Sequence, residues 1–168
     1  MKPTTKAWFT QQVICHQTSL FRTARAILSS DEDAEDAVQE AILSAYTRLD
    51  TLRDPEKFKP WLLRILVNQC YTLRRQEKPT VDLTEVADIL PAETRDTAES
   101  LTLRQAVEQL PQDLQAPITL FYYEDLTIRQ IARVLSLSEP AVKTRLSRGR
   151  DRLRRLMRWI RWKHTEKS

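Results

Sequence analysis

The chain has 168 residues, including eight prolines but a single glycine, Gly149. Tight hairpins, glycine-rich phosphate loops and dinucleotide-binding turns use glycine for its backbone freedom, so this composition argues against them and favours an all-α fold. Hydrophobic residues make up 41% and charged residues 30% of the chain, which is typical of a folded globular protein and not of a disordered one.

The net charge of +4 is unevenly distributed along the chain. Residues 127–168 hold 13 Lys or Arg against three Asp or Glu, whereas the remainder of the chain is net negative. A basic C-terminal third on an acidic body indicates that this third binds a polyanion. A solvated charged helix would have the same composition, so charge alone does not decide between the two interpretations.

Two cysteines, Cys15 and Cys70, are too few for a disulfide framework, and we expect both to pack as small core residues. Cys15 and His16 have no second Cys/His cluster to complete a metal site, so no metal or cofactor is predicted. The longest apolar stretch, residues 61–67, is interrupted by Arg64 and is much shorter than the ~20 residues of a membrane span. Because no signal peptide is visible either, the sequence predicts a cytoplasmic protein without membrane insertion.

Apolar residues at helical spacing predict a first small helical domain over residues 1–76. Two apolar faces lie within residues 13–49, and a third begins at residue 61. Asp54 is expected to cap a helix that begins with Pro55, because proline suits a first helical position.

Residues 77–97 contain two prolines and mostly acidic charges, so we expect a flexible acidic linker. A second helical domain is predicted over residues 98–168. In it, Thr127 and Gln130 have the spacing of a capping box, which marks the start of a short helix. Ser138 is expected to cap the long basic helix that follows after a tight turn. Two helices joined in this way, the second one basic, indicate a helix-turn-helix.

At 100° per residue, the last predicted helix has two opposite faces, one apolar and one polar. The polar face suits DNA recognition, because short side chains let a helix enter the major groove and Arg148 can donate two hydrogen bonds to a guanine. An ordinary amphipathic surface helix has a similar pattern, but the capped helix and the tight turn before it favour DNA binding. The candidate DNA-binding residues are Lys143, Thr144, Arg145, Ser147 and Arg148.

The end of the chain mixes Trp159 and Trp162 with cationic residues. We expect this tail to extend the last helix and its tryptophans to pack on the domain. A helix that lies on a membrane surface has a similar composition.

Two further patterns lie in the first domain. An amphipathic segment carries acidic and amide side chains on one face, which suits docking to a basic partner helix or simply solvation; they are Asp33, Asp36, Gln39 and Glu40. A later segment combines an aromatic, an amide and several cations, which suits single-stranded nucleic acid, although the aromatic alone is more typical of a core. Its candidate residues are Trp61, Arg64, Asn68, Arg74 and Arg75.

In this order, the patterns resemble the extracytoplasmic-function (ECF, group 4) sigma factors of bacterial RNA polymerase, within the sigma-70 family. In the first domain the resemblance rests on DAEDAVQE at 33–40 and on the spaced Phe, Trp, Leu, Arg and Ile of FKPWLLRI at 58–65. In the second domain it rests on LTIRQIA at 126–132 and AVKTRLSRGR at 141–150. The resemblance covers roughly residues 10–160.

This resemblance implies a protein that is not an enzyme: a sigma factor gives the polymerase its promoter specificity, and the polymerase makes the bonds. Region 2 would correspond to residues 1–76 and region 4 to residues 98–168. The acidic helix would bind the clamp helices of the largest polymerase subunit. The last helix would read the −35 duplex, and the melted −10 element would be read through Arg53, Lys57, Trp61, Arg64, Asn68, Arg74 and Arg75.

The resemblance further implies that the second domain contacts the flap of the second-largest subunit and that an anti-sigma factor is a partner. The sequence departs from the family pattern at Arg129, where an acidic residue is common, and at Pro60. A stand-alone helix-turn-helix regulator is the alternative, but it leaves the first-domain patterns unexplained. An enzyme such as a recombinase would need a nucleophile or metal-binding carboxylates in a cleft, which the sequence does not suggest.

Overall fold

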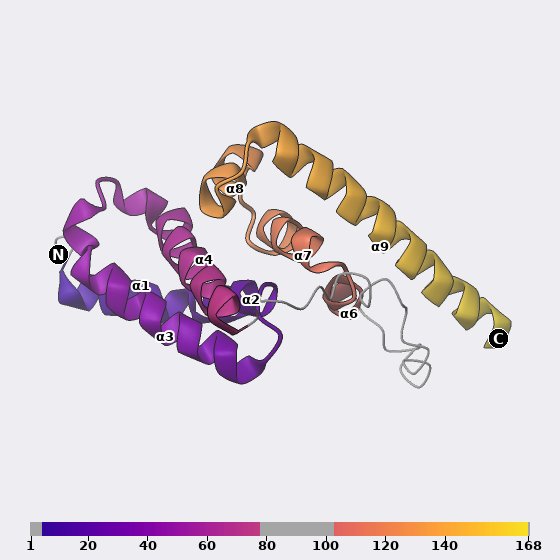
Figure 1. The fold of residues 1–168 in the computed structure, drawn as a ribbon, viewed down its shortest axis with the longest axis horizontal. Helices are drawn as coiled ribbons and strands as arrows, with labels where there is room; N and C mark the ends of the chain where they lie inside the picture. The colour runs from indigo at the N-terminus through magenta and orange to yellow at the C-terminus, as the bar shows by residue number, and fades with distance from the viewer. Residues whose placement is uncertain (1–4, 78–102, 168) are drawn as a thin grey trace.

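The computed structural model describes residues 5–77 and 103–167 (Figure 1), and every regular element in these ranges is helical. This confirms the predicted all-α class. The expected linker, residues 77–97, lies outside the described residues except for Glu77, the last residue of α4.

The first helical unit consists of α1 (Lys6–Cys15), α2 (Gln17–Arg25), α3 (Asp31–Thr47), the short 3₁₀ turns η1 (Leu49–Thr51) and η2 (Pro55–Lys57), and α4 (Phe58–Glu77). The side chains of Thr5 and Ser30 cap α1 and α3 by accepting hydrogen bonds from backbone N–H groups. Asp54 caps η2, in which Pro55 is the first residue, as the sequence predicts. The sequence therefore sets where these helices begin.

The packing of the first unit combines small and aromatic side chains. Alanines on one face of α3 are fully buried, which allows α4 to approach closely; they are Ala34, Ala37, Ala41 and Ala45. Phe58, the first residue of α4, is 1% exposed, and four rings surround it with centroids 5.2–5.9 Å away: Trp8, Phe9, His16 and Trp61. Phe58 thus joins the start of α4 to α1 and to the residue that precedes α2.

One expectation for the first unit is wrong. Cys15 is exposed, because only Phe9 and Val13 of α1 are buried and residue 15 points about 200° away from residue 13 on a helix. Cys70 is buried as expected, and burial raises the pKa of its thiol to about 12.

The second unit consists of α6 (Leu103–Glu108), α7 (Gln112–Ile118), the π-helical turn η4 (Thr119–Tyr123), α8 (Ile128–Leu135) and α9 (Glu139–Lys167). Thr127 and Gln130 form the predicted capping box at the start of α8. Ser136 ends this helix in the left-handed conformation, and Ser138 accepts a hydrogen bond from the backbone N–H of Ala141. These contacts confirm the predicted helix-turn-helix of α8 and α9.

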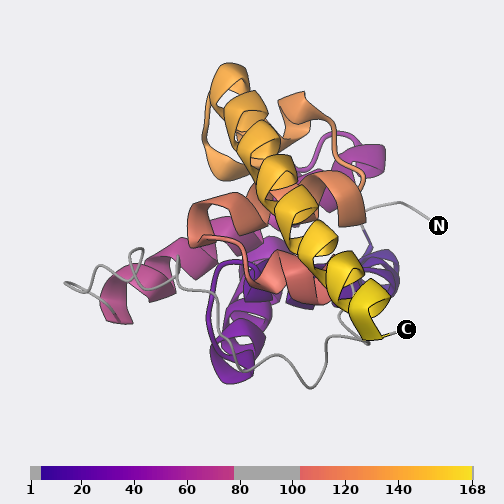
Figure 2. The same cartoon turned by 90° about the vertical axis from the view of Figure 1, so that its right-hand side faces the viewer.

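The predicted extension of the last helix is also found, because α9 continues to Lys167. The side chains of Trp159 and Trp162 lie outside the described part, so their expected packing stays a prediction. In Figures 1 and 2, α9 runs along the outer side of the second unit and its C-terminal end points away from the first unit.

Gly149 lies where α9 crosses α7. A Cβ atom at this position would be 2.6 Å from Cγ1 and 2.7 Å from Cδ1 of Ile118, a residue that is itself buried. Because real Cβ contacts are never this short, glycine allows the two helices to approach each other at this point. Glycine inside a helix lowers helix stability by roughly 1 kcal/mol compared with alanine. The close approach of α7 and α9 explains why glycine is nevertheless present at this position.

We therefore expect Gly149→Leu to lower the free energy of unfolding by about 1–3 kcal/mol, because it overpacks the contact with Ile118. The measurement is thermal unfolding followed by circular dichroism. Ser147→Leu is the matched control, since it puts the same side chain on the exposed face of α9 and should change stability by no more than about 0.5 kcal/mol. Equal stability losses for the two variants would contradict the close-approach explanation.

The two units pack directly against each other. Helix α4 contacts α8, and α2 contacts η4 (Figure 1). The buried apolar side chains of both units belong to one continuous core cluster. The contact between the units therefore includes packed side chains as well as polar groups.

Candidate functional site

The acidic face of α3 is set by the alanine stripe on the opposite side of the same helix. Asp36, Gln39 and Glu40 are exposed, and Asp33 is half-buried in the first turn, where its backbone N–H donates to the Ser30 side chain. The structure thus places the four predicted residues on one side of α3, away from α4.

Leu43 extends this face, and the sequence analysis did not single it out. Its side chain is 63% exposed, which is unusual for a leucine in the middle of a helix. Residues 36, 39, 40 and 43 have the spacing of one helical stripe, so helical periodicity could have identified Leu43 from the sequence. An apolar residue among acidic ones is typical of a protein-binding surface rather than of a solvated face.

The residues predicted to bind the −10 element lie mainly on α4, and in the structure they do not all share one face. At 100° per residue, Trp61, Arg64, Asn68 and Arg75 fall within about 60° of one another, on one face of the helix. Arg64, Asn68 and Arg75 are exposed, whereas Trp61 is half-buried against Phe58. Arg74 falls outside this face and is half-buried. Arg53 and Lys57 are exposed in the segment that precedes α4.

The third predicted set lies in the first three turns of α9. Lys143, Thr144, Ser147 and Arg148 are exposed on the side opposite the buried Val142 and Leu146. In the described part of the chain, neither Lys143 nor Arg148 has an ion-pair partner. These four side chains form a continuous polar and cationic surface at the start of the helix.

Arg145 does not belong to that surface. It is half-buried, and its Nη1 lies 3.5 Å from the carbonyl oxygen of Asp113 in α7. Residue 117, four positions later, is a proline inside α7, so it has no N–H to donate to that carbonyl. Arg145 also lies close to α4: burial raises the pKa of Tyr71, and the positive charges of Arg74 and Arg145 oppose this. Arg145 therefore lies against α7 and near α4 rather than on the exposed face.

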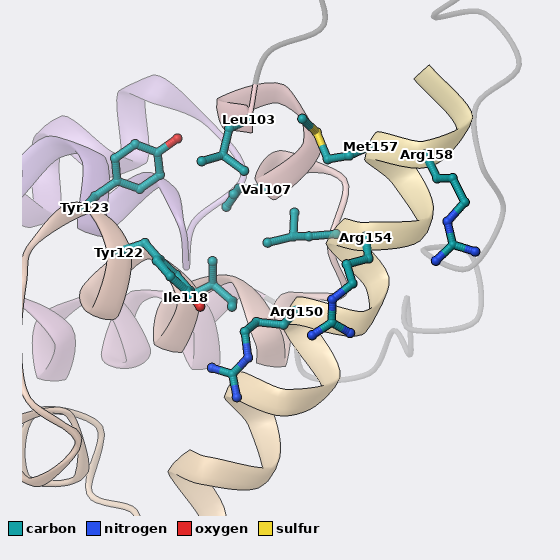
Figure 3. Close-up of a pocket in the computed structure, with 10 residues that line it drawn as sticks. Leu103, Val107, Ile118, Tyr122, Tyr123, Arg150, Arg154, Met157 and Arg158 are labelled. Carbon is teal, nitrogen blue, oxygen red and sulfur yellow. The ribbon is translucent and has the colours of Figure 1, made fainter. Parts of the chain in front are cut away.

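A cavity of about 480 Å³ opens between α6, the α7–η4 segment and α9 (Figure 3). Its walls are mostly apolar and include Leu103, Val107, Ile118 and Met157. The arginines Arg150, Arg154 and Arg158 follow one another at single-turn spacing along the α9 side of the cavity. Such a site suits an apolar segment of a partner that also carries negative charge.

Within residues 5–77 and 103–167, no group of three His, Cys, Asp or Glu residues is placed to hold a metal ion. None of the helices in these ranges combines the length and the apolar character needed to cross a membrane.

Comparisons with known proteins agree with both helical units. The family model of sigma-70 region 2 matches residues 13–80, and that of sigma-70 region 4 matches residues 100–153. RNA polymerase sigma factor SigV of Bacillus subtilis is 34% identical over 149 residues, which cover 88% of this chain and 90% of SigV. ECF RNA polymerase sigma factor SigM of Mycobacterium tuberculosis is 33% identical over 147 residues, which cover 86% of this chain and 74% of SigM.

Solved structures show the same fold. The sigma factor RpoE of Bartonella quintana, in its complex with the anti-sigma factor NepR, has a TM-score of 0.69 at 24% identity and matches 89% of this chain and 96% of its own. CnrH, in its complex with the cytosolic domain of CnrY, has a TM-score of 0.63 at 27% identity and matches 91% of this chain and 89% of its own. Together with the two family regions in the predicted order, these similarities show that the chain belongs to the ECF sigma factors of bacterial RNA polymerase.

Proposed function

We propose that this sigma factor recognises its promoters through two separate DNA-binding surfaces while a third surface holds it on the polymerase core. Region 2 would extend over residues 1–76, the linker over 77–97 and region 4 over 98–168. The chain would make and break no covalent bonds and would act in the cytoplasm, where the polymerase transcribes. The observation that supports this best is the position of three separate polar surfaces on α3, α4 and α9.

The surface on α3 would bind the clamp helices of the largest polymerase subunit. Asp36, Gln39 and Glu40 offer carboxylate and amide oxygens to a basic partner, and Leu43 adds an apolar contact at the C-terminal end of this surface. Charged side chains next to an exposed apolar one are typical of interfaces that need both fast association and specificity.

The surface on α4 would bind the melted −10 element. Trp61 offers an aromatic side chain on the same face of α4 as the exposed amide of Asn68, and Arg64 and Arg75 supply positive charge for the phosphates. Arg53 and Lys57 precede the helix and would extend the same contact. Arg74 would contribute from the flank, since it lies off the main face.

The surface on α9 would bind the −35 duplex in the major groove. Thr144 and Ser147 are short and leave room for the helix, and Arg148 can donate two parallel hydrogen bonds to a guanine. Lys143 is suited to a backbone phosphate. Arg145 would join this set only after its contacts with α7 and α4 are released.

Region 4 would also contact the polymerase flap, and the cavity beside α9 is the proposed place for an apolar segment of that flap. An anti-sigma factor is a further proposed partner, because the sigma factor RpoE has been solved in complex with the anti-sigma factor NepR.

The test of the proposed function is transcription in vitro with core polymerase and a library of randomised promoters. We expect enriched transcripts to share a −35 and a −10 sequence. Transcripts without any shared element, at a sigma concentration that supports holoenzyme formation, would contradict the proposal.

We expect Arg148→Ala to weaken the free energy of DNA binding by about 1–3 kcal/mol through one −35 position and to relax base preference at that position alone. Lys143→Ala is the matched control, because losing a phosphate contact should weaken binding to all −35 variants about equally. The measurement is DNA binding by holoenzyme across single-base −35 variants. An unchanged preference at every position with Arg148→Ala would contradict the assignment.

A further inference from the structure

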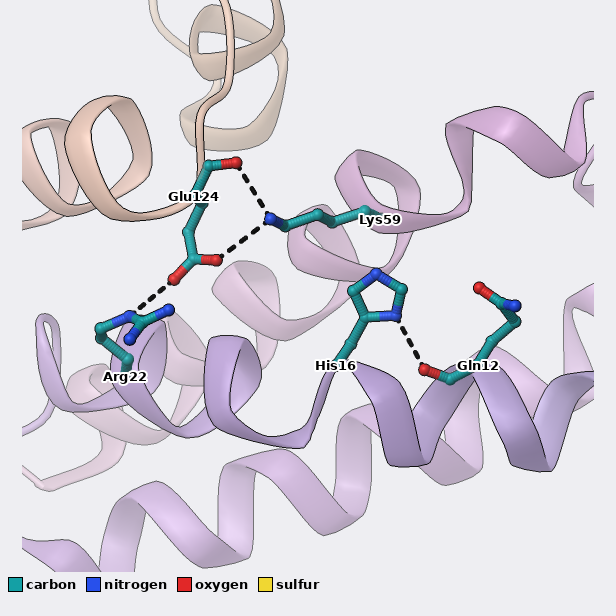
Figure 4. A network of polar contacts seen from close by, with 5 residues as sticks. All are labelled: Gln12, His16, Arg22, Lys59 and Glu124. Carbon is teal, nitrogen blue, oxygen red and sulfur yellow. Dashed lines mark hydrogen bonds and ion pairs between the residues drawn. The ribbon is translucent and has the colours of Figure 1, made fainter.

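A buried carboxylate lies at the contact between the two helical units. The side chain of Glu124, which follows η4 in the second unit, has no exposed surface. Its Oε2 accepts a hydrogen bond from Nε of Arg22 in α2 at 2.8 Å (Figure 4). Lys59 of α4 donates from Nζ to the backbone carbonyl of Glu124 at 3.0 Å, and the same Nζ lies 3.3 Å from Oε1. Both cations belong to the first unit.

This arrangement depends on contact between the units. Burial alone raises the pKa of Glu124, but hydrogen bonds from Arg22 and Ser19 and the charges of Arg22 and Lys59 outweigh this effect and lower it. The Glu124 side chain is therefore a carboxylate, and among the described residues the side chains that compensate its buried charge come from the other unit. A buried charge that loses its partners is strongly unfavourable. The docked arrangement, which buries Glu124, is therefore stable only while Arg22 and Lys59 pair with it.

Further contacts connect the two units around Glu124. The Arg22 guanidinium lies 5.0 Å from the centroid of the Tyr123 ring. It therefore contacts both an aromatic ring and the Glu124 carboxylate of the second unit. Gln112 of α7 donates a hydrogen bond to the carbonyl oxygen of Ile27, just after α2. Helices α4 and α8 pack against each other beside this polar centre.

The docked arrangement places the two proposed DNA surfaces close together. Helix α4 packs on α8, and α8 packs on α9. At about 8–10 Å between packed helix axes, α4 and α9 are separated by roughly 20 Å. The −10 and −35 elements are about 25 base pairs apart, which is about 85 Å of duplex at ~3.4 Å per base pair. The docked form therefore cannot contact both elements.

We propose that Arg22, Lys59 and Glu124 form a latch that holds the free sigma factor in a closed, promoter-incompetent form, and that release of this latch separates the two units on the polymerase. The inference rests on the proposed function, because the need to open follows from reading two distant elements. The joining chain permits the opening, since the about 25 residues between α4 and α6 can span at most about 80–90 Å.

The test is a distance measurement in the full chain, without polymerase or DNA. One dye is attached to the exposed Cys15 and the other to a cysteine introduced by Arg155→Cys on the exposed side of α9. Cys70 stays unlabelled because it is buried and its thiol is hard to ionise. Energy transfer between the dyes then reports whether the units are docked.

We expect Arg22→Gln to raise the ratio of open to closed molecules roughly ten-fold or more, because it removes one partner of the buried carboxylate. Arg25→Gln is the matched control. Arg25 lies one turn further along α2 with the same 33% side-chain exposure, but it pairs at 2.7 Å with Asp31 inside the first unit. It should leave energy transfer unchanged. Glu124→Gln should open the chain as Arg22→Gln does.

Wild-type energy transfer in a helical Arg22→Gln variant, or equal opening by Arg25→Gln, would overturn the latch. A wild-type chain that is already open would overturn it as well. If Glu124→Gln unfolds the second unit, the result with Arg22→Gln decides whether the latch exists, because that substitution lies in the first unit. Opening without promoter-specific transcription would contradict the proposed function and leave the latch supported, so the two failures are distinguishable.

Discussion

Asp36→Arg is expected to abolish assembly of this sigma factor with core polymerase while the fold stays intact. Asp36 is exposed near the centre of the acidic face of α3, and the alanines that pack on α4 lie on the opposite side of the helix. Arginine is a good helix former, so the substitution should not disturb α3. A cation placed against a basic partner costs several kcal/mol, which corresponds to about a 100-fold or greater loss of affinity.

The measurement is holoenzyme formation by gel filtration and by titration of labelled sigma factor with core polymerase. Glu35→Arg is the matched control: it makes the same charge change one residue earlier, on an exposed part of α3 that points about 100° away from Asp36. We expect it to retain most of the affinity. Holoenzyme formation by Asp36→Arg at the wild-type concentration would remove the acidic face from the polymerase interface.

Phe58→Ala is expected to lower the free energy of unfolding by about 3–5 kcal/mol. The ring is 1% exposed and contacts four other rings, so its removal leaves a cavity and also removes aromatic pair contacts. Since small proteins are stable by only about 5–15 kcal/mol, the first unit should be largely lost at modest temperature.

Denaturant unfolding followed by tryptophan fluorescence and circular dichroism measures this effect. Leu43→Ala serves as the control, because it truncates a side chain that is 63% exposed and should change stability by no more than about 0.5 kcal/mol. A loss below about 1 kcal/mol for Phe58→Ala would show that α1 and α4 are not joined through this ring.

Features that depend on neighbouring residues were predictable from the sequence. The capping box of Thr127 and Gln130, the cap at Ser138 and the packed position of Gly149 all follow from spacing within one or two helical turns. The polar faces of α3 and α9 follow from helical periodicity in the same way. These predictions need no knowledge of where distant segments meet.

Features that depend on distant segments were not predictable. Glu124 stands next to Asp125 at the end of an apolar and aromatic run, so by sequence it is typical of a solvated charge, but its partners are 102 and 65 residues away. Arg145 lies on the flank of the recognition face by periodicity, and its contact with the Asp113 carbonyl depends on the proline inside α7, a separate segment of the chain. The exposure of Cys15 is a simpler error, since its neighbours are apolar but its helix buries a different side.

The distribution of contacts between α2, α4 and the second unit also has a consequence for the order in which the chain folds. The main contacts inside each unit, such as α3 with α4 and α7 with α9, join segments near in sequence, whereas the Arg22–Glu124 pair closes a loop of more than 100 residues. Local contacts form fast because they order little chain, and long-range contacts carry a larger loop-closure entropy. We therefore expect each unit to fold on its own first and the joining of the units to be the last and slowest step.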